Sequence, residues 1–243
     1  NITLMGQSAG ADSVQMLCST RATNDLVKQV VMSSGAGDVS SLFAPKERME
    51  AKYDFWNVWK EATGASTLEE LRALSAKDAL AAMGALFGNP NYGFRGVTTN
   101  MGPVWDNVSF PGDGYTLQVP YLCGGNTEDQ VPGLAADALA WCAKQPVDSY
   151  AYCFARQLPG DEKGAFHSAD LWYWFGTLEN CWRPFTDGDY ALSDAMVEYL
   201  TNFAKTGDPN GEGLPVWETA QSSGQGLWLD AVDPMMSEIG KEI

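Results

Sequence analysis

Ser8 lies in a sequence pattern that suits a nucleophile. It is the centre of Gly6-Gln7-Ser8-Ala9-Gly10, which follows an apolar run (residues 1–5) and precedes a helical pattern (residues 11–18). A serine on the sharp turn between a strand and a helix holds its hydroxyl clear of the sheet, and the helix N-terminus behind it suits an anion. We expect Gly6 and Gly10 to be required there, because a Cβ at either position would collide with a neighbouring strand.

A nucleophilic serine needs a general base, and His167 is the sole histidine of the chain. It lies in a short loop (residues 164–168) that follows a predicted strand. The carboxyl ends of parallel strands meet at one edge of a sheet, so this loop can approach Ser8. Serine first and histidine last is also one of the known chain orders of Ser-His-acid groups.

The acid that would orient His167 must come from a strand end between the two. Glu128 and Asp129 follow an apolar run and a Gly-Gly-Asn-Thr loop, which is such a place. Asp106 and Asp113 also lie between Ser8 and His167, but in a stretch rich in turn-forming residues, where aspartates commonly stabilise turns. The residues alone leave the choice between Glu128 and Asp129 open.

The elements around these residues alternate between strands and helices. Strands are expected at 1–5, 29–32, 119–123, 149–155 and 227–229, and helices at 11–18, 45–62, 134–143 and 189–205, with a further helix opened by a capping box at Thr67. Glycines at 124–125 are expected to end the third strand. Such alternation predicts an α/β fold, a mostly parallel sheet with helices on both faces. We expect one domain over residues 1–243, with a helical insertion at about 45–100.

The amino-acid composition disfavours several classes of function. The formal net charge of −16 disfavours nucleic acid and anionic membrane surfaces, which are bound mainly through Lys and Arg. No run approaches the ~20 apolar residues that cross a bilayer. The five cysteines form no C-x-x-C pair and are widely scattered around the single histidine, so we expect no structural zinc site and a reducing, cytoplasmic location.

Five short segments, spread along nearly the whole chain, are together typical of one protein family. They are NITLMGQSAGA (1–11), KQVVMSSG (28–35), VPYLCGGNTED (119–129), GAFHSAD (164–170) with Phe175-Gly176, and NFAKTGDPN (202–210) with Trp217. This pattern resembles the type B carboxylesterases, the cholinesterase-like branch of the α/β-hydrolase fold. The short spacing between acid and base is similar to that of compact bacterial members.

The resemblance implies a carboxylic ester hydrolase that works through an acyl-enzyme, with no metal and no organic cofactor. Ser8 would be the nucleophile, His167 the base and Asp129 the acid, with Glu128 as the alternative, because the family's usual D-E-G triplet reads Glu128-Asp129-Gln130 here. The backbone N–H of Ala9 would be one oxyanion donor. The aromatic run at 171–175 would either line a substrate pocket or belong to the core.

The family's remaining oxyanion donors come from an H-G-G-G-like loop before the nucleophile, which this sequence does not contain. We therefore expect a C-terminal portion of such an enzyme, weak on its own because each donor contributes about 10²–10³ in rate. A second chain carrying the N-terminal half, or self-association, would cover the exposed first strand. A non-catalytic binding module is the alternative, disfavoured because Ser8 and His167 are both present.

Overall fold

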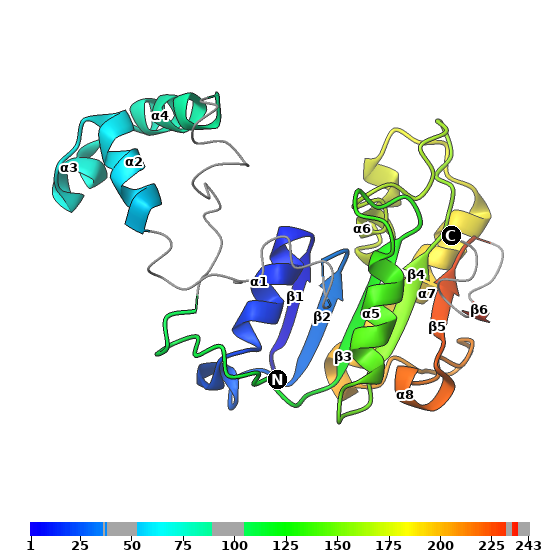
Figure 1. Ribbon diagram of the computed structural model, residues 1–243. Coiled ribbons are helices and arrows are strands. Elements are labelled where there is room, and N and C mark those ends of the chain that lie inside the picture. Colours follow the sequence, from blue (N-terminus) through cyan, green and yellow to red (C-terminus); the bar gives the residue numbers. More distant parts are fainter. Residues whose placement is uncertain (36, 38–52, 89–104, 232–234, 238–243) are drawn as a thin grey trace. The chain divides into compact units, whose positions relative to one another are not determined.

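The structure is a computed structural model that describes residues 1–35, 37, 53–88, 105–231 and 235–237 (Figure 1). The chain divides into two compact units. The first combines Asn1–Phe43 with Asp113–Ile243, and the second is Ala44–Gly112. The range in which we expected an insertion, 45–100, lies within the second unit.

The first unit is built on a six-stranded sheet. Its strands, in spatial as well as chain order, are β1 (Thr3–Gln7), β2 (Gln29–Ser33), β3 (Tyr121–Asn126), β4 (Tyr150–Phe154), β5 (Gly226–Leu229) and β6 (Met235–Ser237). The first five run parallel, whereas β6 pairs with β5 in the antiparallel direction. The prediction of an α/β fold with a mostly parallel sheet is confirmed, and the sequence pattern missed only the short strand β6.

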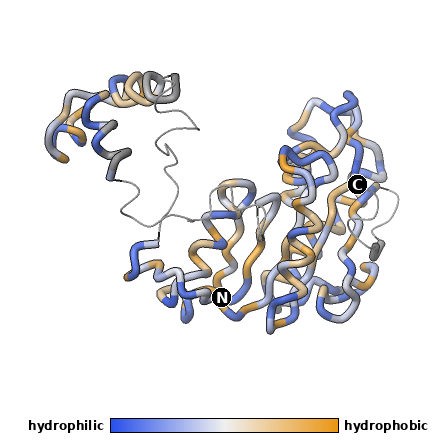
Figure 2. Tube along the Cα trace, in the orientation of Figure 1, coloured by the Kyte–Doolittle hydropathy of each residue, from blue (hydrophilic) through white to orange (hydrophobic). Residues whose placement is uncertain are grey.

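Each face of the sheet carries its own apolar core, because successive strand residues point to opposite sides. Val30 and Met32 pack toward α1 (Ala9–Leu17) and α5 (Leu134–Ala143). Val31 packs on the other face, in the core formed with the long helix α7 (Asp187–Thr206). The strands appear as apolar segments between more polar turns in Figure 2. The expected coverage of both faces by helices is therefore present.

Strand β3 continues through the glycines that were expected to end it, so this boundary was wrong. All six of its residues are buried. A methyl group on Gly124 would overlap the ring of Tyr152 on the neighbouring strand β4. Glycine is kept in the strand because the tyrosine ring occupies the space of a side chain, and this packing outweighs the low strand propensity of glycine.

Local signals at the helix ends explain where the helices begin and stop. Helix α7 starts at a capping box between Thr186 and Asp189 and ends at Gly207, whose φ of 84° favours glycine. The other helical elements in the described part of the first unit are short: a 3-10 turn at Arg21–Thr23, α6 (Leu171–Trp174), a 3-10 turn at Leu178–Asn180 and α8 (Ala220–Ser223).

The second unit contains three helices among its described residues, α2 (Tyr53–Thr63), α3 (Leu68–Ala73) and α4 (Ala76–Gly88). The capping box predicted at Thr67 is confirmed, since its side chain accepts from the backbone of Glu70 while the Glu70 carboxylate accepts in return. The expected helix at 45–62 is described only from Tyr53 onward, and residues 45–52 lie outside the described residues.

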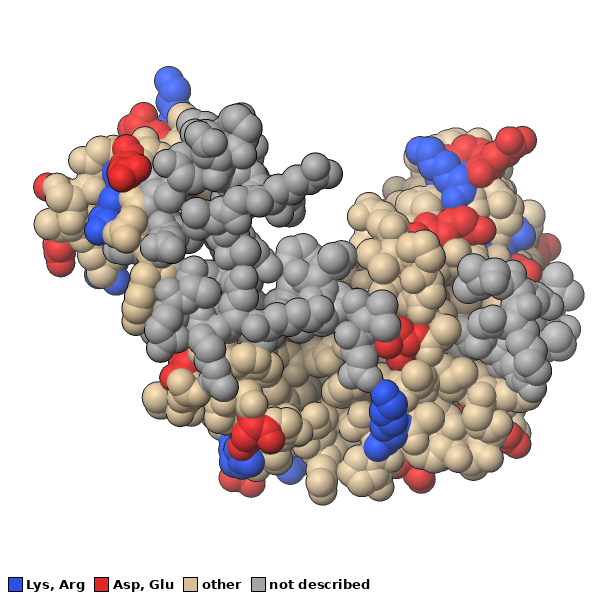
Figure 3. All heavy atoms as spheres, viewed as in Figure 1, with Lys and Arg blue, Asp and Glu red and all other residues tan. Residues whose placement is uncertain are grey.

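The described residues show neither a large patch of one charge in the face drawn in Figure 3 nor a disulfide bond. In the face seen in Figure 3, acidic and basic side chains are scattered over a mainly uncharged surface. All five cysteines carry free thiols, and four of them are buried. Among the described helices, none combines the length and the apolar character needed to cross a membrane.

Candidate active site

Ser8 occupies a strained turn between β1 and α1. Its backbone has φ 57° and ψ −127°, a combination that non-glycine residues rarely adopt. The turn is held from the next strand, because the N–H of Ser8 donates to the carbonyl of Ser33 at 2.8 Å. The serine side chain is thereby lifted to the carboxyl end of the sheet.

Close backbone packing around Ser8 requires glycine at two positions. A methyl group on Gly6 would overlap the carbonyl of Gly10, and one on Gly35 would overlap the carbonyl of Ser8. By contrast, a methyl group on Gly10 would meet no atom within 4 Å, so the expectation that Gly10 is sterically required was wrong. Gly10 lies in the first turn of the helix, facing open space, whereas Gly35 follows the neighbouring strand and was not singled out from the sequence.

The structure brings Ser8, His167 and Asp129 into one chain of contacts. The imidazole Nε2 of His167 lies 2.8 Å from Ser8 Oγ, and its Nδ1 lies 2.6 Å from Asp129 Oδ1. A carboxylate at Asp129 can only accept, so Nδ1 carries the proton and Nε2 is free to accept from the serine hydroxyl. The Asp129 side chain is 1% exposed and that of His167 is 18% exposed, so the histidine still reaches the surface.

Asp129 is fixed by the turn that follows β3. Its second oxygen accepts from the backbone N–H of Asn126 at 2.7 Å, and its own N–H donates to the Asn126 carbonyl. These bonds leave Oδ1 directed at His167. The geometry therefore pairs the histidine with Asp129 rather than with the neighbouring Glu128.

Glu128 instead joins the acid turn to the histidine loop. Its carboxylate accepts from the N–H of Ala165 at 2.7 Å and also bonds the hydroxyl of Thr127. Its backbone N–H donates to the Ala165 carbonyl, and Glu128 and Phe166 form an isolated parallel β-bridge. A methyl group on Gly164 would collide with this carboxylate.

The two other acids between Ser8 and His167 serve their own turns. Asp106 accepts from the backbone N–H groups of Val108 and Phe110. Asp113 accepts from the backbone of Tyr115 and pairs with Arg21, and both kinds of bond lower the pKa of Asp113. This is the turn-stabilising use that the sequence indicated.

The expected oxyanion donor has a suitable position. Ala9 is the first residue of α1 and is exposed, directly beside Ser8. N–H groups in the first turn of a helix have no partner within that helix. The N–H of Ala9 is thus available, next to the serine hydroxyl, for an oxygen that develops negative charge.

Further polar groups at the site were not found from the sequence. The Gln7 amide nitrogen lies 3.3 Å from His167 Nε2, the same atom that faces Ser8. Asp170, three residues after His167, has no exposed surface and accepts from Ser33, Tyr152, Trp174 and Asn126. Burial raises the pKa of Asp170, while the bonds from Ser33, Tyr152 and Asn126 oppose that rise. An aspartate after a histidine carries no local sequence signal for this role.

The helix that follows the nucleophile, α1, also carries a buried carboxyl, that of Asp12. Asp12 is 7% exposed, its N–H donates to the Ser8 carbonyl at 3.2 Å, and Oδ1 has no hydrogen-bond partner among the described residues. Burial raises the pKa of Asp12 to about 7.

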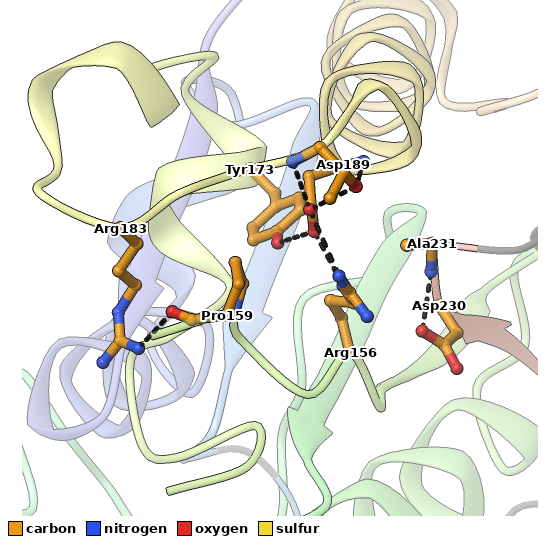
Figure 4. Close-up of polar contacts among 8 residues, drawn as sticks. Arg156, Pro159, Tyr173, Arg183, Asp189, Asp230 and Ala231 are labelled. Carbon is orange, nitrogen blue, oxygen red and sulfur yellow. Dashed lines mark hydrogen bonds and ion pairs between the residues drawn. The ribbon is translucent and has the colours of Figure 1, made fainter. Parts of the chain in front are cut away.

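The aromatic run after the histidine mostly serves the core. Tyr173 and Trp174 are buried in the cluster beneath α7, whereas Phe175 is exposed. The Tyr173 hydroxyl donates to Asp189 at 2.7 Å, and Arg156 donates to both oxygens of the same carboxylate at 2.7 and 3.2 Å (Figure 4). We call Arg156, Tyr173, Thr186 and Asp189 the arginine clamp. It joins the end of β4 to α6 and to the start of α7.

Known proteins resemble the chain in sequence and in fold. The sequence model of the carboxylesterase family matches residues 1–140 and 133–235. Carboxylesterase 5A of Felis catus is 36% identical over 109 residues, which are 41% of this chain and 20% of that enzyme. Bile salt-activated lipase of Homo sapiens is 40% identical over 85 residues, 31% of this chain and 11% of the lipase.

Among solved structures, the carboxylesterase EST55 of Geobacillus stearothermophilus superimposes with a TM-score of 0.73 at 22% identity. The match covers 99% of this chain and 62% of EST55. At this identity the likeness establishes the fold. The chain therefore spans less than two thirds of the EST55 chain and a smaller part of the curated relatives.

Proposed function

The chain belongs to the carboxylesterase family, and from this membership we propose that it cleaves carboxylic esters through Ser8, His167 and Asp129. The observation that carries the proposal is the continuous line of contacts at 2.8 Å and 2.6 Å from the serine hydroxyl through the imidazole to the carboxylate. A serine is activated when a base can take its proton, and the base is effective when an acid holds its tautomer.

In the proposed reaction, Ser8 Oγ attacks the ester carbonyl carbon while His167 Nε2 takes the hydroxyl proton. The tetrahedral oxyanion receives a hydrogen bond from the N–H of Ala9. Collapse of this intermediate breaks the bond to the alcohol oxygen, which receives the proton from Nε2, and leaves an acyl group on Ser8. Water, deprotonated by the same nitrogen, then attacks the acyl carbon. The bond from that carbon to Ser8 Oγ breaks, the carboxylic acid leaves, and Nε2 returns the proton to Ser8 Oγ. Asp129 stays ionised throughout and stabilises the imidazolium that forms.

A second candidate function is a weakly catalytic portion that works when another chain covers β1. One observation favours it: β1 lies at the edge of the sheet, and all five of its residues are only half-buried. The outward backbone groups of an edge strand can pair with a further strand. The partner would be a chain carrying an N-terminal half of the fold, or a second copy of this chain.

A serine-directed fluorophosphonate probe tests the proposed function. We expect the wild-type chain to be labelled at Ser8 and to hydrolyse a p-nitrophenyl ester, and Ser8→Ala to lose both properties. Ser13→Ala is the matched control, since Ser13 is an exposed serine on the same helix that bonds only the Ala9 carbonyl. A Ser8→Ala chain that still reacted with the probe would contradict the assignment.

The same assay separates the two candidates. If a second copy covers β1, the rate per molecule rises with protein concentration, and size-exclusion chromatography places the activity in an oligomer. If a different chain covers β1, the pure chain stays weak at every concentration and the rate rises when that chain is added. A concentration-independent rate from a monomer would favour an independently active chain.

A further inference from the structure

A second buried carboxylate lies beneath the proposed catalytic group and has no part in the reaction described above. Asp170 is fully buried. Its Oδ2 accepts from the Ser33 hydroxyl at 2.8 Å, the Tyr152 hydroxyl at 3.0 Å and the Trp174 indole at 3.2 Å. Its Oδ1 accepts from the Asn126 amide at 3.4 Å.

Both oxygens of the Asp170 carboxyl act as hydrogen-bond acceptors. The Trp174 indole and the Asn126 amide nitrogen can only donate, and they approach different oxygens of Asp170. The hydroxyls of Ser33 and Tyr152 are free to turn their hydrogens toward the same group. Four hydrogen bonds from four different residues therefore hold this one buried side chain in place.

The partners of Asp170 lead to the segments that carry Ser8 and Asp129. Ser33 accepts the backbone N–H of Ser8 at 2.8 Å through its carbonyl. The backbone N–H of Asn126 donates to Asp129 Oδ2 at 2.7 Å. Asp170 is thus two bonds from the nucleophile turn and two bonds from the acid.

Asp170 is tied to the histidine loop as well. It lies in the turn that follows His167, where the N–H of Ala169 donates to the Phe166 carbonyl at 2.9 Å. The Asn126 amide donates to that same carbonyl at 2.7 Å. The chain segments of all three proposed catalytic residues therefore converge on one buried side chain.

We propose that Asp170 is a positioning residue, which fixes the Ser8, Asp129 and His167 segments relative to one another through its bonds to Ser33 and Asn126. This inference rests on the proposed function. A displacement of about 1 Å in a reacting group can lower the rate by as much as ~10²-fold. Loss of the hydrogen bonds to Asp170 should therefore lower the rate by a measurable amount.

Asp170→Asn tests the proposal. The amide has the same size as the carboxyl, but its NH₂ group replaces one of the two oxygens and so faces either the Trp174 indole or the Asn126 amide nitrogen, neither of which can accept a hydrogen bond. The matched control is Asp189→Asn. Asp189 is equally buried and accepts from Arg156, Tyr173 and Thr186, none of which bonds Ser8, Asp129 or His167. In the full 243-residue chain, we expect the rate of fluorophosphonate labelling, per folded molecule, to fall about tenfold in Asp170→Asn and to change less than twofold in Asp189→Asn.

A second measurement uses the fact that His167 is the only histidine. Its ring signals in an NMR spectrum need no assignment, and we expect Asp170→Asn to shift them and their pH titration while Asp189→Asn leaves both unchanged. If Asp170→Asn does not fold, Ser33→Ala removes one bond, keeps the Asp170 charge and should slow labelling about threefold.

Equal labelling of wild type and Asp170→Asn, or unchanged ring signals in the folded variant, would overturn the positioning role. An unlabelled wild type would instead overturn the proposed function, and the NMR comparison would still decide the role of Asp170.

Discussion

The candidate active site and the arginine clamp both contain a fully buried aspartate, yet they satisfy it differently. Asp189 in the clamp receives two bonds from the guanidinium of Arg156. Asp170 receives four bonds from neutral donors. A cation compensates the charge in one region, whereas dipoles alone do so in the other. In the clamp the carboxylate is paired with a cation, whereas among the described residues of the candidate site the only carboxylate that contacts the His167 imidazole is that of Asp129.

Backbone strain is a second difference between the two regions, because it is present beside the candidate site and absent from the clamp residues. Of the four described non-glycine residues with positive φ, three are serines beside the site: Ser8, Ser34 and Ser168. None belongs to the clamp. Strained backbone persists only where the surrounding packing enforces it. The comparison predicts that changes at the site affect rate most, and that changes in the clamp affect stability most.

The largest expected effect comes from exchanging the acid. Asp129→Asn should lower the rate of ester cleavage by about 10⁴-fold, because an amide cannot hold the tautomer that leaves Nε2 unprotonated. Steady-state kinetics with a p-nitrophenyl ester measures this. Glu128→Gln is the control and should retain most activity, since Glu128 bonds Thr127 and Ala165 rather than His167. Equal losses in the two variants would return the identity of the acid to an open question.

The glycines around Ser8 give the next largest effect. Gly6→Ala forces a methyl group into the carbonyl of Gly10, so the turn must move and we expect loss of labelling together with several kcal/mol of stability. Gly10→Ala meets no atom and should be stable, or more stable by about 0.5–1 kcal/mol, because alanine favours helices. Urea unfolding and probe labelling check both variants. A Gly6→Ala protein with the reactivity of wild type would refute the packing argument.

A change in the arginine clamp should lower the stability of the fold and leave the labelling rate nearly unchanged. Arg156→Met leaves the Asp189 carboxylate buried without its cation, and we expect a loss of about 3 kcal/mol in unfolding free energy. The labelling rate of the molecules that remain folded should stay within about twofold of wild type. Chemical denaturation and labelling, measured on the same sample, test the separation. Loss of rate without loss of stability would mean that the clamp positions His167.

The clamp also predicts a pH dependence of stability. Burial alone would raise the pKa of Asp189, but hydrogen bonds from Arg156, the Thr186 backbone and Tyr173 lower it to about 2 from the ordinary 3.8. Because the folded-state value is the lower one, this stabilisation is present above the ordinary value and is lost as pH falls toward 2. Wild type should therefore lose more stability between pH 5 and pH 2 than Asp189→Asn, as followed by thermal unfolding.

The smallest expected effect is at Gln7. Its amide contacts His167 Nε2 at 3.3 Å, longer than the 2.8 Å contact to Ser8, and so competes only weakly for that nitrogen. Gln7→Leu should change the labelling rate by no more than about threefold. A tenfold or greater change would move Gln7 into the group of residues that the reaction depends on.

Much of this arrangement was predictable because it follows from local pattern and chain order. The parallel sheet, its helices on both faces and the family were predicted from alternating elements and from the segments around Ser8 and His167. The structure also brings Asp129 to His167, although their catalytic role remains a proposal. Choosing Asp129 over Glu128 needed the turn geometry at Asn126, which residue types do not encode.

What the sequence did not reveal depends on contacts between distant segments. Asp170 looks like an ordinary turn residue until β4 brings Tyr152 to it. The extension of β3 through Gly124 depends on the same tyrosine. Gly35 is required because the Ser8 carbonyl and the Ala11 side chain lie against it. In each case the partner is far away in the chain, where spacing carries no signal.

The β-bridge between Glu128 and Phe166 makes the distance from acid to base independent of the length of chain between them. The bridge joins the two ends of the segment from Asp129 to His167 directly. We therefore expect the turns within this segment to gain or lose residues without moving the Asp129 carboxylate or the His167 imidazole. The exposed Pro146, in the turn between α5 and β4, is a suitable insertion point for a tag or reporter peptide.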